Sequence, residues 1–523
     1  MPATLQSFLS GQWLRGEGVE AELKNPVSGE LLGTASARKL DIAGALDHAR
    51  RVGSPALQEM SYGQRAKLLG QIADTLSANR ARYEDIAIAN SGNTKSDAAI
   101  DIDGGIGTLK YYARLGASLG DARSLLDQGP VRLAKAENFQ AIHLMIPRHG
   151  IAIHINAFNF PSWGLWEKAA VALLAGVPVL AKPASSTALL AHEMVRDVIA
   201  AGLLPNGSFS ILCGGIGDTL SHLTSDDLIA FTGSHDTARQ IRGHPNVVER
   251  SIPVNIEADS INAAVLAPDA APASVVFDAF LREVAREMTT KAGQKCTAIR
   301  RALIPSSCTK AVSEALVERL KKTAVGDPRR EDVRMGPVVN RVQQAAVLAG
   351  IAGLMKETEI LCGGSDSPEL EGIVRTKSAF VSPTLLRAPE ADAARLVHEI
   401  EVFGPVATLL TFDDADQAIS LVKRGGGSLV ASIFSADMDF LSRVARGLGP
   451  GHGRVLAIDP SIAEDHTGHG IVMPQCNHGG PGRAGNGEEL GGLHGLRFYH
   501  QRVAIQGSSD LLPRLQADTA SIH

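Results

Sequence analysis

The pattern of hydrophobic and polar positions changes character along the chain. Between residues 41 and 119, hydrophobic residues recur every three or four positions, which predicts a run of amphipathic helices. Short strand-like segments around a turn precede them, between residues 7 and 35. Gly129-Pro130 interrupts the helical pattern, and residues 131–148 read as two extended segments. These two segments form either a hairpin that leaves the domain or an edge of it.

From residue 149 onward, strand and helix patterns alternate. The expected strands are 151–155, 177–181, 209–213 and 228–231, and the expected helices between them are 163–175 and 187–201. A second alternating region runs from 262 to about 475, with helices near 275–295 and 310–323. Strands that alternate with helices of this length form parallel sheets, which bind ligands beyond the carboxyl ends of their strands. The pattern therefore predicts an α/β fold.

Polar residues and glycines follow the predicted strands of the first alternating region. They are Asn159, Lys182, Gly217, Gly233 and Ser234. Such residues at strand ends suit a dinucleotide whose phosphates approach the backbone. A glycine turn by itself is weak evidence, because any tight turn uses glycine. The Gly-x-Gly-x-x-Gly fingerprint of a standard Rossmann domain does not follow the first strand.

Two residues offer the chemistry for covalent catalysis. Cys296 would act as a thiolate, and we expect the adjacent Lys295 to lower the pKa of its thiol. Glu257 follows the apolar segment 252–256, which indicates a buried strand end where the pKa of a carboxyl group rises toward neutrality. Such a carboxylate takes a proton from the thiol or from an attacking water. The alternative is that Cys296 is an inert buried cysteine.

Composition narrows the class of protein. Hydrophobic residues make up 44% of the 523 residues and charged residues 20%, as in ordinary globular proteins, and the length indicates more than one domain. The net charge of -5 implies no general attraction to nucleic acid or to an anionic membrane. The longest apolar run, 169–181, is too short to span a bilayer, and we expect no signal peptide.

The cysteines and histidines show no metal or disulfide pattern. The five cysteines are scattered in the sequence, and the 16 histidines, including His466, His469 and His478, have no metal-ligand spacing. We therefore expect no metal, no disulfide framework and a reducing cytoplasm.

An ordered set of short motifs resembles the aldehyde dehydrogenase superfamily over nearly the whole chain. The motifs are Asn25-Pro-Val-Ser-Gly-Glu30, Asn159-Phe-Pro161, Lys182-Pro183, Phe231-Thr-Gly-Ser234, Glu257, Gly293-Gln-Lys-Cys296 and Glu401-Val-Phe-Gly-Pro405. Each motif is modest alone, but their common order and spacing make a chance match improbable.

The resemblance implies roles for particular residues. Cys296 would be the nucleophile, Glu257 the general base, and Asn159 an oxyanion donor together with the backbone N–H of Cys296. Glu489 matches a glutamate that relays protons in some members. The implied cofactor-binding residues are Lys182, Ser185, Gly217, Gly233, Ser234, Glu401 and Phe403.

The resemblance also implies a domain plan. Two Rossmann-like parallel-sheet domains would be joined by a small β element that holds subunits together in a dimer or a higher homo-oligomer. The expected parts are a dinucleotide-binding domain (1–130 and 149–258), a catalytic domain (259–476), an oligomerisation element (131–148 and 494–508) and a glycine-rich active-site loop (477–493). The last ten or so residues read as a tail.

Departures from the family pattern refine the expected function. Glu257 is followed by Ala-Asp-Ser instead of the common Leu-Gly-Gly-Lys, and Ala238 replaces a common glycine. The glycine-rich ending resembles a branch that oxidises CoA-linked aliphatic semialdehydes in aromatic catabolism, including aerobic benzoate degradation. Many NAD-preferring members carry a glutamate where this chain has Ser185, so we predict NADP as cofactor, with NAD used more weakly.

Three functions stay open at this point. The first is NAD(P)-dependent oxidation of an aldehyde to a carboxylic acid. The second is a CoA-acylating dehydrogenase, in which CoA resolves the acyl-enzyme in place of water. The third is a non-catalytic cofactor-binding protein. A general base at Glu257 favours hydrolysis by water, and an intact set of Cys296, Glu257 and Asn159 argues against the third.

Overall fold

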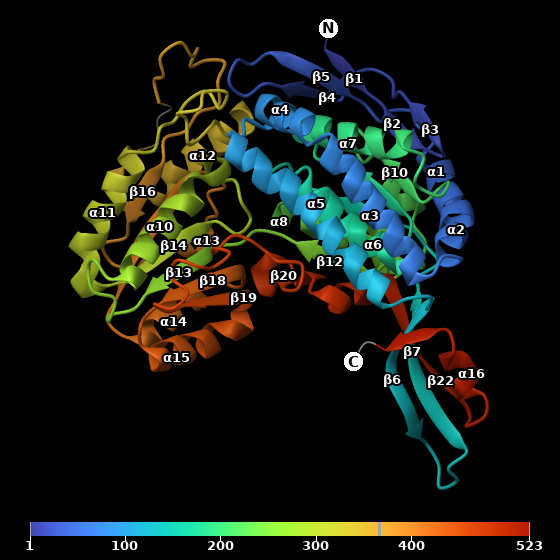
Figure 1. Cartoon of the computed structure of the whole chain (residues 1–523). Coiled ribbons are helices and arrows are strands. Elements are labelled where there is room, and N and C mark those ends of the chain that lie inside the picture. The colour runs from blue at the N-terminus through green and yellow to red at the C-terminus, as the bar shows by residue number, and fades with distance from the viewer. Residues whose placement is uncertain (1, 365–367, 522–523) are drawn as a thin grey trace.

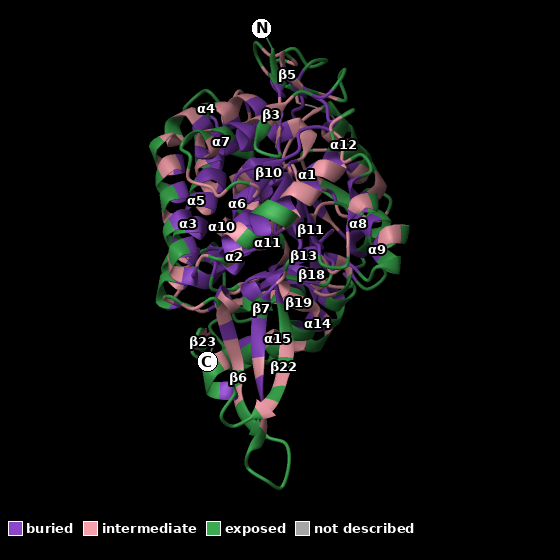
Figure 2. Cartoon of the chain, turned by 90° about the vertical axis from the view of Figure 1, so that its right-hand side faces the viewer, coloured by how far each residue is buried: buried purple, intermediate pink, exposed green. Residues whose placement is uncertain are grey.

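A computed structural model describes residues 2–364 and 368–521. Figure 1 shows two α/β bodies side by side, with a narrow β arm extending from the first. The strands at the centre of both bodies are buried, and the arm combines a mostly buried central strand with half-buried and exposed flanking strands (Figure 2). This arrangement confirms the predicted α/β class with two parallel sheets.

The first body is built on a seven-stranded sheet. Across the sheet, the strands are β12 (Val254–Glu257), β11 (Leu228–Thr232), β8 (Ala152–Ile155), β9 (Val179–Lys182), β10 (Phe209–Ile211), β2 (Ser7–Leu9) and β3 (Gln12–Leu14). The five from β12 to β10 are parallel, and β2 and β3 add antiparallel strands at the β10 edge. A separate three-stranded sheet contains β1 (Ala3–Leu5), β5 (Leu31–Ala35) and β4 (Ala21–Lys24).

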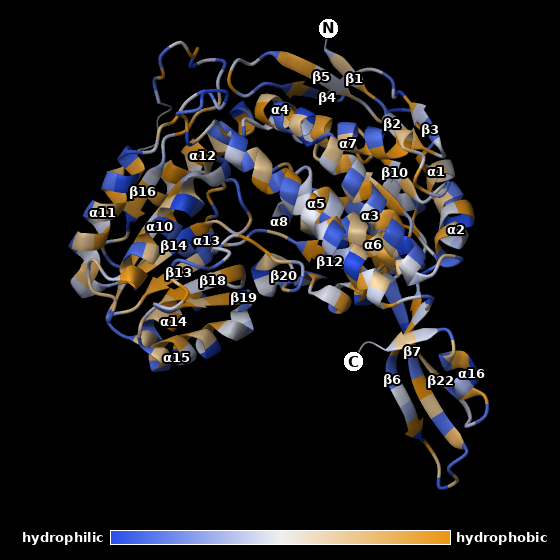
Figure 3. Cartoon of the chain, in the orientation of Figure 1, coloured by the Kyte–Doolittle hydropathy of each residue, from blue (hydrophilic) through white to orange (hydrophobic). Residues whose placement is uncertain are grey.

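The helices of the first body come from the chain before and after arm strands β6 (Ser124–Arg132) and β7 (Phe139–Pro147). They are α1 (Ile42–His48), α2 (Ser54–Gln58), α3 (Tyr62–Ala78), α4 (Arg80–Ser91), α5 (Lys95–Ser118), α6 (Trp163–Ala175), α7 (Ala188–Ala200), α8 (His235–Arg242) and α9 (Pro245–Glu249). Helix α6 has the predicted bounds, because Gly176 ends it in a left-handed conformation (φ 89°) that favours glycine. The mixture of hydrophobic and hydrophilic residues along α3 and α5 is visible in Figure 3, as expected for helices with one face on a core.

The second body has its own seven-stranded sheet. The strands are β15 (Glu359–Cys362), β16 (Thr384–Arg387), β17 (Val406–Phe412), β14 (Ile299–Pro305), β13 (Asn262–Leu266), β18 (Ser428–Phe434) and β19 (His452–Ile458). All pair in parallel except β15, which is antiparallel to β16. The helices are α10 (Val275–Thr289), α11 (Thr309–Lys321), α12 (Arg341–Leu354), α13 (Leu396–Glu399), α14 (Ala415–Lys423) and α15 (Met438–Leu448).

The glycine-rich segment is a hairpin that lies between the two sheets. Strands β20 (Asn477–Gly480) and β21 (Gly487–Leu490) pair with each other. The Asn255 side-chain amide of β12 donates to the Glu488 carbonyl at 3.2 Å and accepts from the Glu488 N–H at 2.9 Å. A Cβ atom on Gly485 or Gly487 would lie 2.3 Å from the Ile256 carbonyl oxygen, so glycine is required where the hairpin crosses β12.

The β arm contains four strands in the order β22 (His500–Ser508), β7 (Phe139–Pro147), β6 (Ser124–Arg132) and β23 (Thr519–Ser521). The predicted pairing between the 131–148 segment and the C-terminal strand is confirmed along the full length of β22 and β7. Two details of the prediction are wrong. The arm already begins at Ser124, and residues 492–499 form a 3₁₀ turn, which leaves only 500–508 as a strand.

The prediction that the last ten or so residues form a tail is also wrong for those that the structure describes. Helix α16 (Leu512–Gln516) packs Leu512 against the arm, and β23 pairs in parallel with β6. The sequence misleads here because these elements are short and gain their apolar contacts only from strands far away in the chain. Among the described residues, no helix has the length and apolar character that crossing a membrane requires.

Candidate active site

A strained turn presents Cys296. After α10, Lys291, Ala292 and Gly293 all adopt left-handed backbone conformations, with φ of 52°, 52° and 69°. Such conformations are costly for residues other than glycine and persist only where surrounding contacts hold them. A Cβ atom on Gly293 would lie 2.1 Å from the Gly404 carbonyl oxygen, so the turn is pressed against that backbone. The turn therefore places Cys296 at a fixed point between the two bodies.

Three side chains from distant parts of the chain converge at this point. Sγ of Cys296, a carboxylate oxygen of Glu257 at the end of β12 and a ring nitrogen of His478 on β20 all lie within 4.8 Å of one another. Nε2 of His478 is 2.8 Å from Oε2 of Glu257, and these residues are 6% and 2% exposed. A thiol, an imidazole and a carboxylate are also metal-ligand types. Because the imidazole and carboxylate already pair, we interpret the cluster as an ion pair beside a thiol.

The ion pair reverses the expected titration of Glu257. Burial alone would raise the pKa of this carboxyl group, as the sequence suggested. The charge of His478, with a smaller contribution from Lys168, outweighs burial and lowers the pKa to about 2. The expectation of a pKa near neutrality is therefore wrong, because the compensating cation comes from a segment far away in the sequence. In the same pair, burial would lower the pKa of His478, but Glu257 raises it.

Lys295 does not act on the thiol as expected. Its Nζ lies 2.6 Å from Oε1 of Glu287 on α10, and both side chains are almost fully buried. Burial raises the pKa of the Cys296 thiol well above its usual value, and the negative charge of Glu257 adds to the increase. Sequence adjacency misled the prediction, since the Lys295 side chain is committed to its own ion pair.

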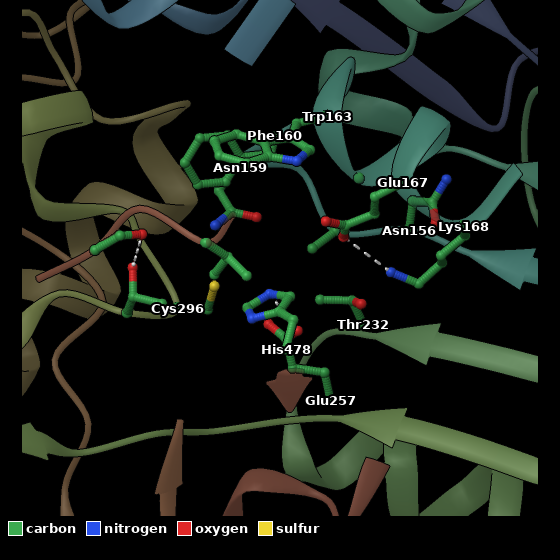
Figure 4. Close-up of a pocket in the computed structure, with 15 residues that line it drawn as sticks. Asn156, Asn159, Phe160, Trp163, Glu167, Lys168, Thr232, Glu257, Cys296 and His478 are labelled. Atoms are coloured by element: carbon green, nitrogen blue, oxygen red, sulfur yellow. Dashed lines mark hydrogen bonds and ion pairs between the residues drawn. The ribbon is translucent and has the colours of Figure 1, made fainter. Parts of the chain in front are cut away.

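A narrow cavity of about 40 Å³ opens beside the thiol (Figure 4). Asn159, which is 7% exposed, lines it together with Cys296 and Glu257. Figure 4 shows the Asn159 amide directed into the same space as the Cys296 sulfur. Phe160 and Trp163 supply an aromatic wall. The cavity combines a nucleophile, an amide donor and a carboxylate around a space suited to a small carbonyl group.

A buried charge cluster lies behind this cavity. Nζ of Lys168 is 3.0 Å from Oε2 of Glu489 and 3.4 Å from Oε1 of Glu167. Burial raises the pKa of Glu489 to about 7, although Lys168 opposes the increase. Glu489 also accepts a 3.4 Å hydrogen bond from the side-chain amide of Asn255. Glu489 itself does not line the cavity, but Lys168 and Glu167 do.

A larger cavity of about 500 Å³ meets the first one at Cys296. The predicted cofactor residues that line it are Lys182, Ser185, Gly233, Ser234, Glu401 and Phe403. Gly217, the seventh, is not part of the lining. Ser185 begins a 3₁₀ turn directly after β9. Lys182, Gly233 and Ser234 lie there because residues at the ends of parallel strands face one edge of the sheet. Ser185, Glu401 and Phe403 were implied only by the family resemblance.

The larger cavity fits a nicotinamide dinucleotide. Oε2 of Glu401 accepts from the Ser260 N–H at 3.2 Å. Oε1 of Glu401 is buried without a hydrogen-bond partner among the described residues, and its nearest cation is the Arg300 guanidinium at 3.9 Å, so it can still accept from a ligand hydroxyl. Burial raises the pKa of Glu401 to about 7. Phe403 packs edge-on against Phe158, with ring centroids 5.7 Å apart, and forms an apolar wall nearby.

Sequence reasoning missed two residues at this centre. The sequence shows His478 only among histidines without metal-ligand spacing, and it gives no signal for Lys168. The one available signal was the position of His478 at the start of a glycine-rich segment with charged residues at its end. Neither residue is near Glu257 or Cys296 in sequence, so no local pattern links them.

Comparison with known proteins agrees with this geometry. The model of the aldehyde dehydrogenase family matches residues 13–505. A 3,4-dehydroadipyl-CoA semialdehyde dehydrogenase of Aromatoleum evansii is 51% identical over 91% of this chain and 93% of its own length. The D-glyceraldehyde dehydrogenase (NADP(+)) of Thermoplasma acidophilum is 26% identical over 96% of each chain.

Solved structures share the fold. A structure of betaine aldehyde dehydrogenase from Staphylococcus aureus in complex with NAD+ has a TM-score of 0.84 and 23% identity, and it covers 97% of this chain and 95% of its own. An E. coli NADP-dependent enzyme has a TM-score of 0.84 and 24% identity, with 97% and 98% covered.

Proposed function

Since the chain belongs to the aldehyde dehydrogenase family and is an oxidoreductase acting on aldehydes, we propose that it oxidises a CoA-linked aliphatic semialdehyde to the carboxylic acid, with NADP as preferred cofactor. One observation carries the proposal. Cys296, Glu257 and Asn159 line both cavities, so the nucleophile lies where the substrate space meets the cofactor space. An aldehyde carbon bonded to Sγ at this junction faces the cofactor cavity on one side and the carboxylate on the other.

The first half of the reaction builds a bond to sulfur. The Cys296 thiolate attacks the aldehyde carbon and forms a thiohemiacetal. The Asn159 amide and the Cys296 backbone N–H donate to the oxygen that becomes negative, where fixed donors are most effective. A nicotinamide cofactor, when bound, supplies the acceptor for the hydride that leaves this carbon. Glu401, Lys182, Ser185 and the Gly233-Ser234 turn would hold it.

The second half releases the acid. The acyl group remains on Sγ as a thioester, and a water molecule attacks its carbonyl carbon while Glu257 accepts a proton from the water. The C–S bond then breaks and returns Cys296. A carboxylate with a pKa of about 2 is a weak base and does not hold a proton at neutral pH, so a proton received by Glu257 has to pass to another group. Glu489, with a pKa of about 7, is the better final acceptor.

Two variants test this mechanism. Cys296→Ala should abolish turnover but leave cofactor binding nearly intact. Glu257→Gln should slow release of the acid, so that mass spectrometry detects an acyl group on Cys296. Wild-type turnover by Cys296→Ala would contradict the mechanism. Product analysis separates the alternative reaction, because a CoA-acylating enzyme would release a new thioester at the oxidised carbon and not a free acid.

The choice of substrate is supported by the relative from Aromatoleum evansii, whose name gives a CoA-linked semialdehyde and which is 51% identical. We infer a role in aromatic catabolism, such as benzoate degradation through CoA thioesters. Comparing kcat/KM for CoA-linked semialdehydes with that for free aldehydes of equal length tests the inference. Equal values would remove the CoA group from the recognised substrate.

The preference for NADP is supported by Ser185. This uncharged residue lines the cofactor cavity together with Lys182, so a 2′-phosphate placed there meets a cation and a hydroxyl but no carboxylate from this position. The hydroxyl donates to the Gly214 carbonyl at 3.4 Å and would have to turn from it to donate to the phosphate. A glutamate in its place would repel the phosphate.

Assembly and cellular setting are inferred from the arm and the cysteines. Strand β22 is an edge strand of the arm, and no strand of the described residues pairs with its outer side, which is therefore open to a second strand. We propose that the arm joins subunits in a homodimer or a higher homo-oligomer.

We assign residues 1–130 and 149–258 to cofactor binding, apart from the start of arm strand β6 at Ser124, and 259–476 to catalysis. All five cysteines are free, which is consistent with a reducing cytoplasm.

A further inference from the structure

We propose that His478 is a positioning residue that supplies one positive charge shared by Cys296 and Glu257, so that the proton of the thiol passes to the carboxylate inside a cluster of constant charge. The inference rests on the proposed function, since it explains how the nucleophile of that reaction is activated. It replaces Lys295, the cation that sequence adjacency suggested, with one that only the tertiary structure supplies.

The geometry places one imidazole beside two potential anions. Nε2 of His478 is 2.8 Å from Oε2 of Glu257, and a ring nitrogen of His478, a carboxylate oxygen of Glu257 and Sγ of Cys296 lie within 4.8 Å of one another. His478 and Glu257 are almost fully buried, so water screens these charges little. The ring also lines the substrate cavity, so its charge acts where the reaction occurs.

The proton balance of the activation step is simple. The S–H bond of Cys296 breaks and an O–H bond forms on Glu257, while His478 keeps its proton. One negative charge thereby moves from the carboxylate to the sulfur, and both positions lie next to the same imidazolium. No electron is gained or lost in this step. Without the imidazolium, either anion would be buried with only more distant cations to balance it.

Charged groups on the neighbouring elements β12, α6 and β19 shift the pKa of His478. Glu257 on β12 and Glu167 on α6 stabilise its cationic form, and Arg454 on β19 opposes it. The Lys168–Glu489 pair on α6 and β21 lies further away and is internally compensated. The nearest group is the Glu257 carboxylate, so its effect prevails and favours the charged imidazole.

The Lys295 side chain has no comparable position. It is buried against Glu287 at 2.6 Å, and a Cβ atom on Gly470 would lie 2.3 Å from its Nζ, so Gly470 closes the space around it. Its charge is therefore compensated before it can act on the thiol. His478 is the cation that contacts Glu257 directly.

The test is alkylation of Cys296 by iodoacetamide, measured by mass spectrometry as a function of pH in enzyme without aldehyde or cofactor. Alkylation reports the thiolate fraction, which falls tenfold for each unit by which the thiol pKa rises. His478→Gln should slow alkylation at neutral pH by roughly tenfold or more and move the profile upward by about one pH unit or more. The kcat should fall, while KM for the cofactor changes little.

Glu257→Gln provides a second measurement that does not depend on the first variant folding. In this variant the thiol proton goes to solvent water, because the carboxylate that accepts it is absent. The His478 imidazolium then pairs with the sulfur alone, so alkylation at neutral pH should become faster, although acid release becomes slower. If Glu257 acted on the thiol only as a base, the same variant would slow alkylation. In the double variant His478→Gln/Glu257→Gln, alkylation of Cys296 should no longer be faster than in the wild type.

His494→Gln is the matched control, because Nε2 of His494 lies 2.7 Å from Oε2 of Glu488 on the same hairpin but the side chain is exposed. It should leave the alkylation profile and kcat unchanged. An unchanged profile in His478→Gln, or slower alkylation in Glu257→Gln, would overturn the proposal. Since alkylation needs no aldehyde, a failure of the proposed substrate or reaction would leave this test intact, and the two failures are distinguishable.

Discussion

Replacing Lys295 by methionine separates its structural role from the chemistry of its neighbour Cys296. Nζ of Lys295 and Oε1 of Glu287 are 2.6 Å apart, with side chains 3% and 1% exposed. Removing the lysine leaves the Glu287 carboxylate buried without its partner. Removing one member of a buried ion pair costs about 3–5 kcal/mol, because the remaining charge is uncompensated.

The predicted effect is on melting temperature and not on the thiol. At about 2–4 °C per kcal/mol for a unit of this size, Lys295→Met should lower the melting temperature of the second body by roughly 6–20 °C. Thermal unfolding followed by circular dichroism measures this shift. Well below the transition, alkylation of Cys296 and turnover should stay within about threefold of wild type, since three-fold is under 1 kcal/mol.

The pH dependence of the shift has a defined sign. Burial would raise the pKa of Glu287, but the Lys295 ammonium outweighs it and lowers the pKa in the folded protein. A lowered pKa contributes stability above the unfolded value, about 4.3, and that stability is lost as pH falls. The difference in melting temperature between wild type and Lys295→Met should therefore shrink at acid pH.

The double variant Lys295→Met/Glu287→Met is the control. It replaces the pair by apolar side chains of similar length, which is often neutral or stabilising, so the melting temperature should largely recover. An unchanged melting temperature in the single variant would refute the reasoning about the buried pair. Loss of alkylation in the single variant, equal to the loss in His478→Gln, would show that Lys295 and not His478 supplies the charge that the thiol needs.

Three further predictions concern the cofactor, the proton acceptor and the assembly. Ser185→Glu should shift preference toward NAD, mainly by raising KM for NADP, and an unchanged NADP/NAD ratio of kcat/KM would contradict the role of Ser185. Burial raises the pKa of Glu489 to about 7, so acid release in single-turnover experiments should become faster as pH rises through about 7. Glu489→Gln should remove this limb of the profile, and its persistence would exclude Glu489 as the acceptor. Sedimentation at micromolar concentration should show a species heavier than the 55.0 kDa chain. Val503→Pro in edge strand β22 should dissociate this species. A wild-type protein found only at 55.0 kDa would contradict the proposed role of the arm.

Local pattern in the sequence determined the elements of the fold. Helix α6 is predicted to the residue because its apolar run ends at Gly176, where a left-handed conformation stops the helix. The strands that carry Asn159, Lys182 and Gly233 at their ends are predicted because strand and helix periods alternate there. Their polar ends gather in one cavity, since parallel strands bring their carboxyl ends to one edge.

Only the tertiary structure decided the electrostatics of the site. The sequence placed Lys295 beside Cys296, but its side chain pairs with Glu287 on α10. The apolar segment before Glu257 indicated a raised pKa, yet the contact with His478 lowers it to about 2. The physical reason is that burial can be inferred from local hydrophobicity, whereas the sign of a pKa shift depends on which charge lies within a few ångströms. That charge arrives here on a hairpin from the far end of the chain.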